Sequence, residues 1–152
     1  KMNKKGFTLV ELMAVIVILG VLMGVAVPNA LGIYKNMKIK YFCEKISTIE
    51  QAATLYGQDK YGEEVTTNSN ELSLAKVSVL DLVKAGYVKK DDDNCQTSSN
   101  TSNCVKDPRD DSSLDRTKVE IYTKSRRIYA RYIYTNTDAT DKVCGDKVYK
   151  TS

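Results

Sequence analysis

Apolar positions along this chain follow two successive patterns. Phe7 to Val27 is a run of 21 residues with a single charge, Glu11. As a helix this run is about 31 Å long, close to the ~30 Å hydrocarbon core of a membrane. Beyond Pro28, apolar side chains recur at spacings of three and four. They are Ile39, Phe42, Ile46, Ile49, Ala53 and Tyr56. The patterns predict one long helix over roughly 7–60, bent at Pro28, apolar in its first half and amphipathic in its second.

The remainder of the chain predicts a small head that contains both helix and strand. A short helix is expected over Val77–Ala85, with Ser78 as its N-cap and Gly86 just after its end. Alternation of apolar and polar positions predicts three antiparallel strands with two turns. The strands are Thr117–Thr123, Ile128–Thr135 and Lys142–Tyr149, and the turns lie at Ser125–Arg126 and around 136–141. The polar residues 63–76 and 89–115 predict turns and loops. The fold class is therefore α+β, a long bent N-terminal helix packed on a small antiparallel sheet.

Charge adds a direction to the apolar run. The formal net charge is +4, but Lys1, Lys4 and Lys5 stand just before the run, and residues 7–152 carry 20 basic and 19 acidic side chains. Lysines in front of a membrane-length segment keep that end in the cytoplasm and send the rest across. The basic balance is thus mainly a topology signal, and no nucleic-acid partner is expected.

Histidine is absent from the 152 residues. This excludes histidine-based acid–base catalysis, catalytic triads and histidine metal sites. No other compact catalytic constellation stands out, so we expect neither an enzyme nor a cofactor.

Three hypotheses compete for the N-terminus. A cleaved secretory signal would need a short apolar stretch and a small-residue cleavage site, whereas this run is long and ends at Pro28. A plain membrane anchor accounts for the length and the lysines but leaves Glu11 unexplained, because a carboxylate in an apolar helix usually has a partner. The third hypothesis gives Glu11 a partner.

The segment Lys4-Lys5-Gly6-Phe7-Thr8-Leu9-Val10-Glu11 resembles the class III signal of type IV pilins and pseudopilins. A basic leader, a Gly, a Phe and a Glu five positions after the Gly all agree with that signal, as do Gly20 and Pro28. The resemblance covers residues 4 to about 60 well. It implies that a membrane-embedded prepilin peptidase cuts after Gly6 and that Phe7 is then N-methylated.

The same resemblance gives Glu11 and Pro28 roles in assembly. Cleavage creates a positive amine at Phe7, and a carboxylate one helical turn further on can neutralise it, within one subunit or on its neighbour. The implied parts are a leader (1–6), a hydrophobic membrane and assembly helix (7–28), an amphipathic helical half (29–62) and a globular head (63–152).

Four cysteines allow three pairings. The head is expected outside the cytoplasm, where disulfides persist. We favour Cys95–Cys104 with Cys43–Cys144, and the alternative is Cys43–Cys95 with Cys104–Cys144. A four-cysteine zinc site lacks the usual C-x-x-C spacing.

Two weaker signals remain in the head. An acidic loop that includes Asp107, Asp110 and Asp111 could hold Ca²⁺, although it has no EF-hand spacing and a solvated loop is more common. A basic-aromatic group could stack on single-stranded DNA, but strand alternation with charges on the exposed face explains the same residues. Its members are Lys124, Arg126, Arg127, Tyr129, Arg131 and Tyr132.

The leading hypothesis is a structural subunit, a major type IV pilin in its uncleaved form. It would be inserted in the plasma membrane, processed, and polymerised by the pilus assembly machinery into an extracellular filament for adhesion or motility. The alternatives are a pseudopilin of a type II secretion or DNA-uptake system, and a membrane-anchored binding module that does not polymerise.

Overall fold

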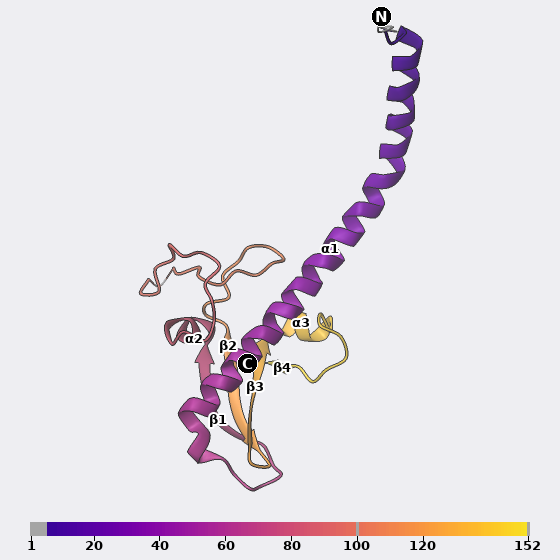
Figure 1. The fold of residues 1–152 in the computed structure, drawn as a ribbon. Helices are drawn as coiled ribbons and strands as arrows, with labels where there is room; N and C mark the ends of the chain where they lie inside the picture. Colours follow the sequence, from indigo (N-terminus) through magenta and orange to yellow (C-terminus); the bar gives the residue numbers. More distant parts are fainter. Residues whose placement is uncertain (1–5, 100, 152) are drawn as a thin grey trace, which may run out of the picture. The chain divides into compact units, whose positions relative to one another are not determined.

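The structure is a computed structural model that describes residues 6–99 and 101–151, so the leader residues 1–5 lie outside the described part. The chain divides into two compact units, Lys1–Met37 and Lys38–Ser152. One helix of 53 residues, α1 (Leu9–Tyr61), belongs to both (Figure 1). The predicted long helix is confirmed, and Pro28 lies inside it.

The second unit, called the head below, is built on a four-stranded sheet with the order β1-β2-β3-β4. Its strands are β1 (Leu72–Ser78), β2 (Lys118–Lys124), β3 (Arg127–Tyr134) and β4 (Lys150–Thr151). β1, β2 and β3 pair antiparallel, and β4 runs parallel to β3. Three short helices, η1 (Gly62–Glu64), α2 (Val79–Lys84) and α3 (Asn136–Thr140), complete it. The α+β class is confirmed, with a mixed sheet in place of an antiparallel one.

Local signals located the β2–β3 hairpin and α2 well. The hairpin turns at Ser125 and Arg126, whose φ angles of 49° and 62° are those of a two-residue hairpin turn. Ser78 caps α2, and its side chain and that of Asp81 each accept a hydrogen bond from the other's backbone N–H.

Three element predictions are wrong. The polar segment 63–76, predicted as turn, contains most of β1, whose irregularity between Ser73 and Ala75 interrupts the alternation that marks a strand. The turn predicted around 136–141 is the helix α3, which Thr135 caps by accepting the backbone N–H of Asp138. The segment Lys142–Tyr149, predicted as a strand, is instead a series of turns. Positive φ at Lys142 and Gly145 prevents extended backbone there, and the strand comes later, as β4.

The predicted apolar stripe of α1 forms the centre of the head. Phe42, Ile46, Ile49 and Ala53 are each at most 1% exposed. They belong to one core cluster with the inward-facing side chains of β2 and β3, whose members are Val119, Ile121, Ile128, Tyr132 and Tyr134. At the two ends of the stripe, Ile39 is exposed and Tyr56 is half-buried. The core therefore begins near Phe42, inside the head.

Gly57 allows the last turns of α1 to lie close to the sheet. A Cβ atom at this position would be 2.7 Å from Cγ2 of Ile121 and 2.9 Å from Cγ2 of Ile128. Both distances are too short for carbon atoms in contact, so glycine is required by packing. The position follows Ala53 by four residues and extends the apolar stripe, and this spacing is the signal in the sequence that marks it.

Two disulfides tie the head together. Cys43 of α1 is bonded to Cys144, 101 residues further along the chain, and Cys95 is bonded to Cys104. This is the pairing favoured above. In the chain-entropy account a bond that closes a loop of this length stabilises a fold by about 4–5 kcal/mol.

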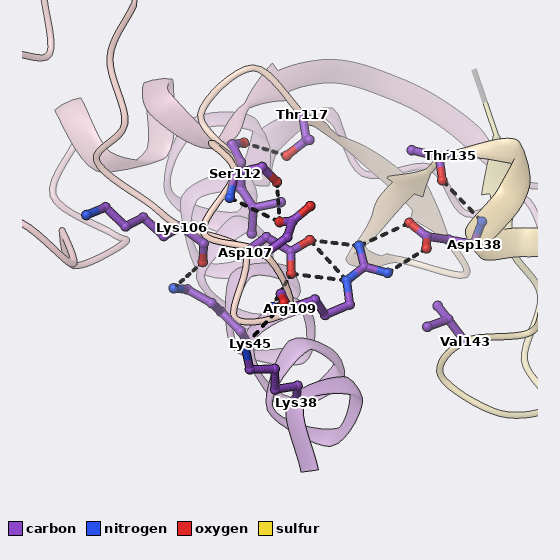
Figure 2. A network of polar contacts seen from close by, with 12 residues as sticks. Lys38, Lys45, Lys106, Asp107, Arg109, Ser112, Thr117, Thr135, Asp138 and Val143 are labelled. Carbon is purple, nitrogen blue, oxygen red and sulfur yellow. Dashed lines mark hydrogen bonds and ion pairs between the residues drawn. The ribbon is translucent and has the colours of Figure 1, made fainter. Parts of the chain in front are cut away.

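Polar contacts fasten the long loop between α2 and β2 onto α1 (Figure 2). The guanidinium of Arg109 lies over the ring of Phe42 at 3.6 Å and pairs with both Asp107 (2.7 Å) and Asp138 (2.6 Å). Burial opposes the charge, but the two carboxylates outweigh it and raise the pKa of Arg109 above its ordinary value. Arg109 therefore links the loop, α1 and α3 at one point.

Lys45 of α1 makes a second attachment. Its ammonium group donates to Asp91 and to the carbonyl oxygen of Lys106, the latter at 2.7 Å. Further along the loop, the buried carboxylate of Asp115 accepts the backbone N–H groups of Cys104 and Val105. A loop without regular structure is thus held by buried polar contacts.

We predict that Gly57→Ala destabilises the head. The added methyl group must displace Ile121 or Ile128 within a closed core, at a cost of about 1–3 kcal/mol. The matched control is Gly62→Ala, where nothing lies within 4 Å of the added carbon. Thermal unfolding of the full chain in detergent, followed by tyrosine circular dichroism, compares the two. Equal melting temperatures for the two variants would contradict the close approach at Gly57.

A second prediction concerns acid. The pKa of Asp81 is lowered by hydrogen bonds from Ser78. The pKa values of Asp91 and Glu120 are also lowered, because hydrogen bonds from Lys106 and Lys45 and from Arg131 outweigh burial. A carboxyl group with a depressed folded pKa stabilises the fold above its unfolded pKa, and this contribution is lost as pH falls through the folded value.

The free energy of unfolding should therefore be nearly constant from about pH 8 to about pH 5, because the chain has no histidine to titrate in that range. It should fall below about pH 4, where these carboxyl groups become protonated. Urea titrations of the full chain across this range measure it. A loss of stability between pH 7 and pH 5 would contradict the assignment to these carboxylates.

Candidate processing and assembly site

The residues singled out at the N-terminus meet at the start of α1. Gly6, Phe7 and Thr8 precede the helix, which begins at Leu9. All three are exposed, and the Phe7 side chain is 82% exposed. The Gly6–Phe7 peptide bond thus lies in a short non-helical segment, which is the form of chain that a protease cleft accepts.

Glu11 caps the helix at this point. Its Oε2 accepts the backbone N–H of Thr8 at 3.0 Å, and the Thr8 hydroxyl accepts the backbone N–H of Glu11 at 3.3 Å. This reciprocal pair is a capping box, which satisfies two N–H groups that the first turn leaves without helical partners. The pattern Thr-x-x-Glu is the signal for this cap, a role of Glu11 that its charge alone does not predict.

The cap also places the Glu11 carboxylate next to Phe7. Its partner, the Thr8 N–H, belongs to the residue that directly follows Phe7. A negative charge at a helix N-terminus is favourable, because the unpaired N–H groups give that end a partial positive charge. An amine created at Phe7 would add a full positive charge within one residue of the same carboxylate.

The first unit has no core of its own. Every described residue from Gly6 to Met37 is exposed, and its large apolar side chains are mostly 45–75% exposed. Its mean hydropathy reaches 2.7, and by length and composition the helix could cross a membrane. Such an apolar surface is stable only in lipid or against other apolar surfaces.

Small residues leave gaps along this surface. A Cβ atom added at Gly20 or Gly24 would meet nothing within 4 Å, so both positions are open to a neighbouring helix. Their G-x-x-x-G spacing is typical of close helix packing in membranes.

Of the three residues considered as calcium ligands in the acidic loop, Asp107 has a structural role. Asp107 is 3% exposed and its carboxylate is engaged by Arg109. Asp110 and Asp111 are exposed, and Asp110 accepts two hydrogen bonds from Ser112. Within residues 6–99 and 101–151, no three acidic, Cys or His side chains are grouped as a metal site.

The basic-aromatic group divides between the two faces of the sheet, with Lys124, Arg127, Tyr129 and Arg131 together on the face away from α1 and Tyr132 on the other. Tyr132 faces α1 and is 4% exposed, whereas Tyr129 is on the opposite face of the sheet. Arg131 is bound to Glu120 at 2.7 Å and to Glu71 at 2.9 Å, and its guanidinium lies over Tyr122. The strand alternation that the sequence predicted separates the group into two faces.

Comparison with known proteins agrees with the N-terminal site. The family described as the prokaryotic N-terminal methylation motif matches residues 1–27. The chain is 36% identical over 88 residues to type II secretion system core protein G of Escherichia coli (strain K12), which covers 58% of this chain and 60% of that protein. It is 32% identical over 79 residues to the protein of the same name from Klebsiella michiganensis, with coverages of 52% and 56%. The chain therefore spans less than two thirds of the length of these two relatives.

A third relative is matched over most of its length. Competence protein ComGC of Bacillus subtilis (strain 168) is 33% identical over 91 residues, which are 59% of this chain and 80% of ComGC. No solved structure matches the chain significantly. With the methylation motif, the capped apolar helix and this coverage, the chain belongs to the type IV pilin family, which includes the pilin-like proteins of secretion and competence systems.

Proposed function

We propose that this chain is the precursor of a filament subunit that assembles through the apolar half of α1. The observation that carries the proposal is an apolar helix surface, exposed over its whole length, with one carboxylate at its N-terminal end. A membrane anchor alone needs the first feature. A polymer of membrane-extracted subunits needs both, because each charged N-terminus must find a partner away from water.

In this proposal prepilin peptidase cuts between Gly6 and Phe7 on the cytoplasmic side of the plasma membrane, and Phe7 is N-methylated. The leader is residues 1–6, residues 7–28 are the membrane and assembly helix, residues 29–62 are the amphipathic half, and residues 63–152 are the rest of the head. The head lies on the far side of the membrane, where its two disulfides are stable.

Assembly then exchanges one apolar environment for another. Lipid covers α1 before assembly, and neighbouring α1 helices cover it in the filament, so the apolar surface remains out of water in both states. The carboxylate of Glu11 pairs with the Phe7 amine of a neighbour, which favours a fixed axial stagger between subunits. A head-to-tail contact of this kind generates an open helical polymer.

Two kinds of filament fit this mechanism. The first is a type IV pilus, in which the chain is the major subunit of an extracellular filament for adhesion or motility. The second is a pseudopilus of a secretion or DNA-uptake system, and the relatives named as secretion core protein G and competence protein favour it. In both kinds of filament the partners of the chain are further copies of itself, the peptidase and the assembly machinery. In both, the chain is a structural subunit and not an enzyme.

Processing gives the first test. The mature protein should begin at Phe7 and carry one methyl group, because the scissile bond lies in the exposed segment before the helix. Intact mass of the protein in sheared filaments and in membranes measures this, and Gly6→Val, which fills the protease cleft, should leave the precursor uncut. A different mature N-terminus would exclude the proposal. Electron microscopy of the same cells separates long surface filaments from a short pseudopilus.

Three variants separate the charge of Glu11 from its role as a cap. Glu11→Gln keeps the capping hydrogen bond and removes the charge, Thr8→Ala weakens the cap and keeps the charge, and Glu11→Ala removes both. If Glu11 acts by pairing with an amine, Glu11→Gln should assemble as poorly as Glu11→Ala, about tenfold below the wild type, which corresponds to ~1.4 kcal/mol.

Thr8→Ala should stay within about twofold of the wild type, because it leaves the charge pair intact. Sheared filament mass per cell, normalised to membrane-bound subunit, measures all three. Wild-type assembly of Glu11→Gln would show that capping, and not charge, is what the filament requires.

A further inference from the structure

The sheet of the head has an outer face, opposite the one on which α1 packs. α1 packs on the inner face, where Val119, Ile121 and Tyr132 are buried (Figure 1). Residues that alternate with these point outward. They form what we call the outer sheet face, with the charged members Lys76, Lys118, Lys124, Arg127, Arg131, Lys150, Glu71 and Glu120.

This face is strongly positive. Its six basic and two acidic side chains give a formal charge of +4, whereas residues 7–152 as a whole carry +1. The remaining surface of that part of the chain is therefore formally −3. The charge of the head is segregated, so that two copies attract each other when the outer sheet face of one meets an acidic region of the other.

One end of the outer sheet face holds two lysines, Lys76 and Lys118. Lys76 and Lys118 make no ion pair with any carboxylate in the described ranges 6–99 and 101–151. They border a cavity of about 380 Å³, here called the basic cavity. Its lining includes Arg116, Ile133 and the hydroxyl-bearing residues Thr117 and Thr135. This combination of cations and hydroxyl groups suits a carboxylate ligand.

The complementary feature is a turn in the loop between α2 and β2, which we call the acidic knob (107–112). Its backbone is fixed by two hydrogen bonds of 2.8 Å, from Asp107 N–H to the Ser112 carbonyl and from Asp111 N–H to the Asp107 carbonyl. Within the knob, Arg109 pairs with Asp107 (Figure 2). The guanidinium of Arg109 also lies over the ring of Phe42 of α1. The knob is thus a preorganised element, which reduces the entropy cost of binding.

The knob presents its charge to solvent. Asp110 and Asp111 are exposed, and neither pairs with a cation in the part of the chain that the structure describes. Hydrogen bonds from Ser112 hold the pKa of Asp110 below its ordinary value, so this carboxyl group is ionised at neutral pH.

We propose that the acidic knob of one copy binds the basic cavity of the next copy. The exposed carboxylates of the knob make no ion pair with Lys76 or Lys118 in the part of the chain that the structure describes, so both surfaces remain available to a second copy. Each copy can therefore use both at once, and the contact is head-to-tail, as an open polymer requires. The inference deepens the proposed filament function and rests on it.

A nucleic acid fits the outer sheet face less well. Glu71 and Glu120 lie among the cations and would repel a continuous phosphate backbone. Tyr122 and Tyr129 stack on each other at 5.5 Å, and Arg131 lies over Tyr122, so the Tyr122 ring has neighbours that compete with a stacked base. The carboxylates of an acidic knob, in contrast to a continuous phosphate backbone, can bind at Lys76 and Lys118 without covering Glu71 and Glu120.

Cysteine cross-linking of the full chain tests the contact. All four native cysteines are in disulfides, so thiols introduced by Asp111→Cys and Lys118→Cys would be the only free ones in the described chain. Oxidation of membranes and sheared filaments should give a ladder of multimers when one chain carries both substitutions. The control pair, Glu63→Cys with Lys118→Cys, should give none. Absence of the ladder from the first pair, or dimers alone, would overturn the inference.

Charge reversal gives an independent readout. Lys76→Glu with Lys118→Glu, or Asp110→Lys with Asp111→Lys, should each lower filament yield about tenfold, and all four changes together should restore most of it, because the charges are complementary again. Lys89→Glu and Glu63→Lys, both exposed, are the matched controls.

The outcomes separate this inference from the proposed function. Filaments that tolerate both reversals would overturn the knob–cavity contact and leave the filament function intact. A wild-type chain that forms no filament would exclude the filament function, and the membrane ladder would still decide the contact. Binding of a DNA duplex that is lost in Lys76→Glu with Lys118→Glu, without a ladder, would assign the face to nucleic acid and overturn the inference.

Discussion

The apolar surface of the first half of α1 constrains everything else in this protein. From Phe7 to Met37 none of the described residues covers it, and each large side chain left in water would cost about 1.5–3 kcal/mol. Lipid or other helices must therefore bury it. Because both can do so, the same helix can serve as a membrane segment and as a polymer interface, and passage between the two states does not expose it to water.

The head can be small because it shares this helix. Its core uses the apolar stripe from Phe42 to Gly57 as one layer and the sheet as the other, so α1 contributes to the folded head and to the unburied surface alike. The Cys43–Cys144 bond, Arg109 and Lys45 all attach later parts of the chain to the first turns of α1 within the head. A pulling force on α1 is thus transmitted to several points of the head at once.

Sequence patterns predicted the parts governed by local rules. Helix periodicity located α1, the Ser78 cap located α2, and alternation located β2 and β3. They failed where tertiary contacts decide. β1 is irregular and takes its form from pairing with β2, and the segment after α3 is held as turns by positive φ at Lys142 and Gly145 and by the bond to Cys43. The need for glycine at position 57 depends on Ile121 and Ile128, which lie more than 60 residues away in sequence.

At the N-terminus, sequence predicted a site at Gly6, Phe7 and Glu11 but not how the Glu11 carboxylate is satisfied in the chain as it stands. An unpaired carboxylate in an apolar segment would disfavour membrane insertion of the precursor. The capping box removes this difficulty, because Glu11 accepts the Thr8 N–H while that end of the helix offers a partial positive charge. In the proposed pathway cleavage then creates a stronger partner, the Phe7 amine. The same carboxylate is satisfied locally in the precursor and can be shared between subunits afterwards, so processing controls when the assembly contact becomes available.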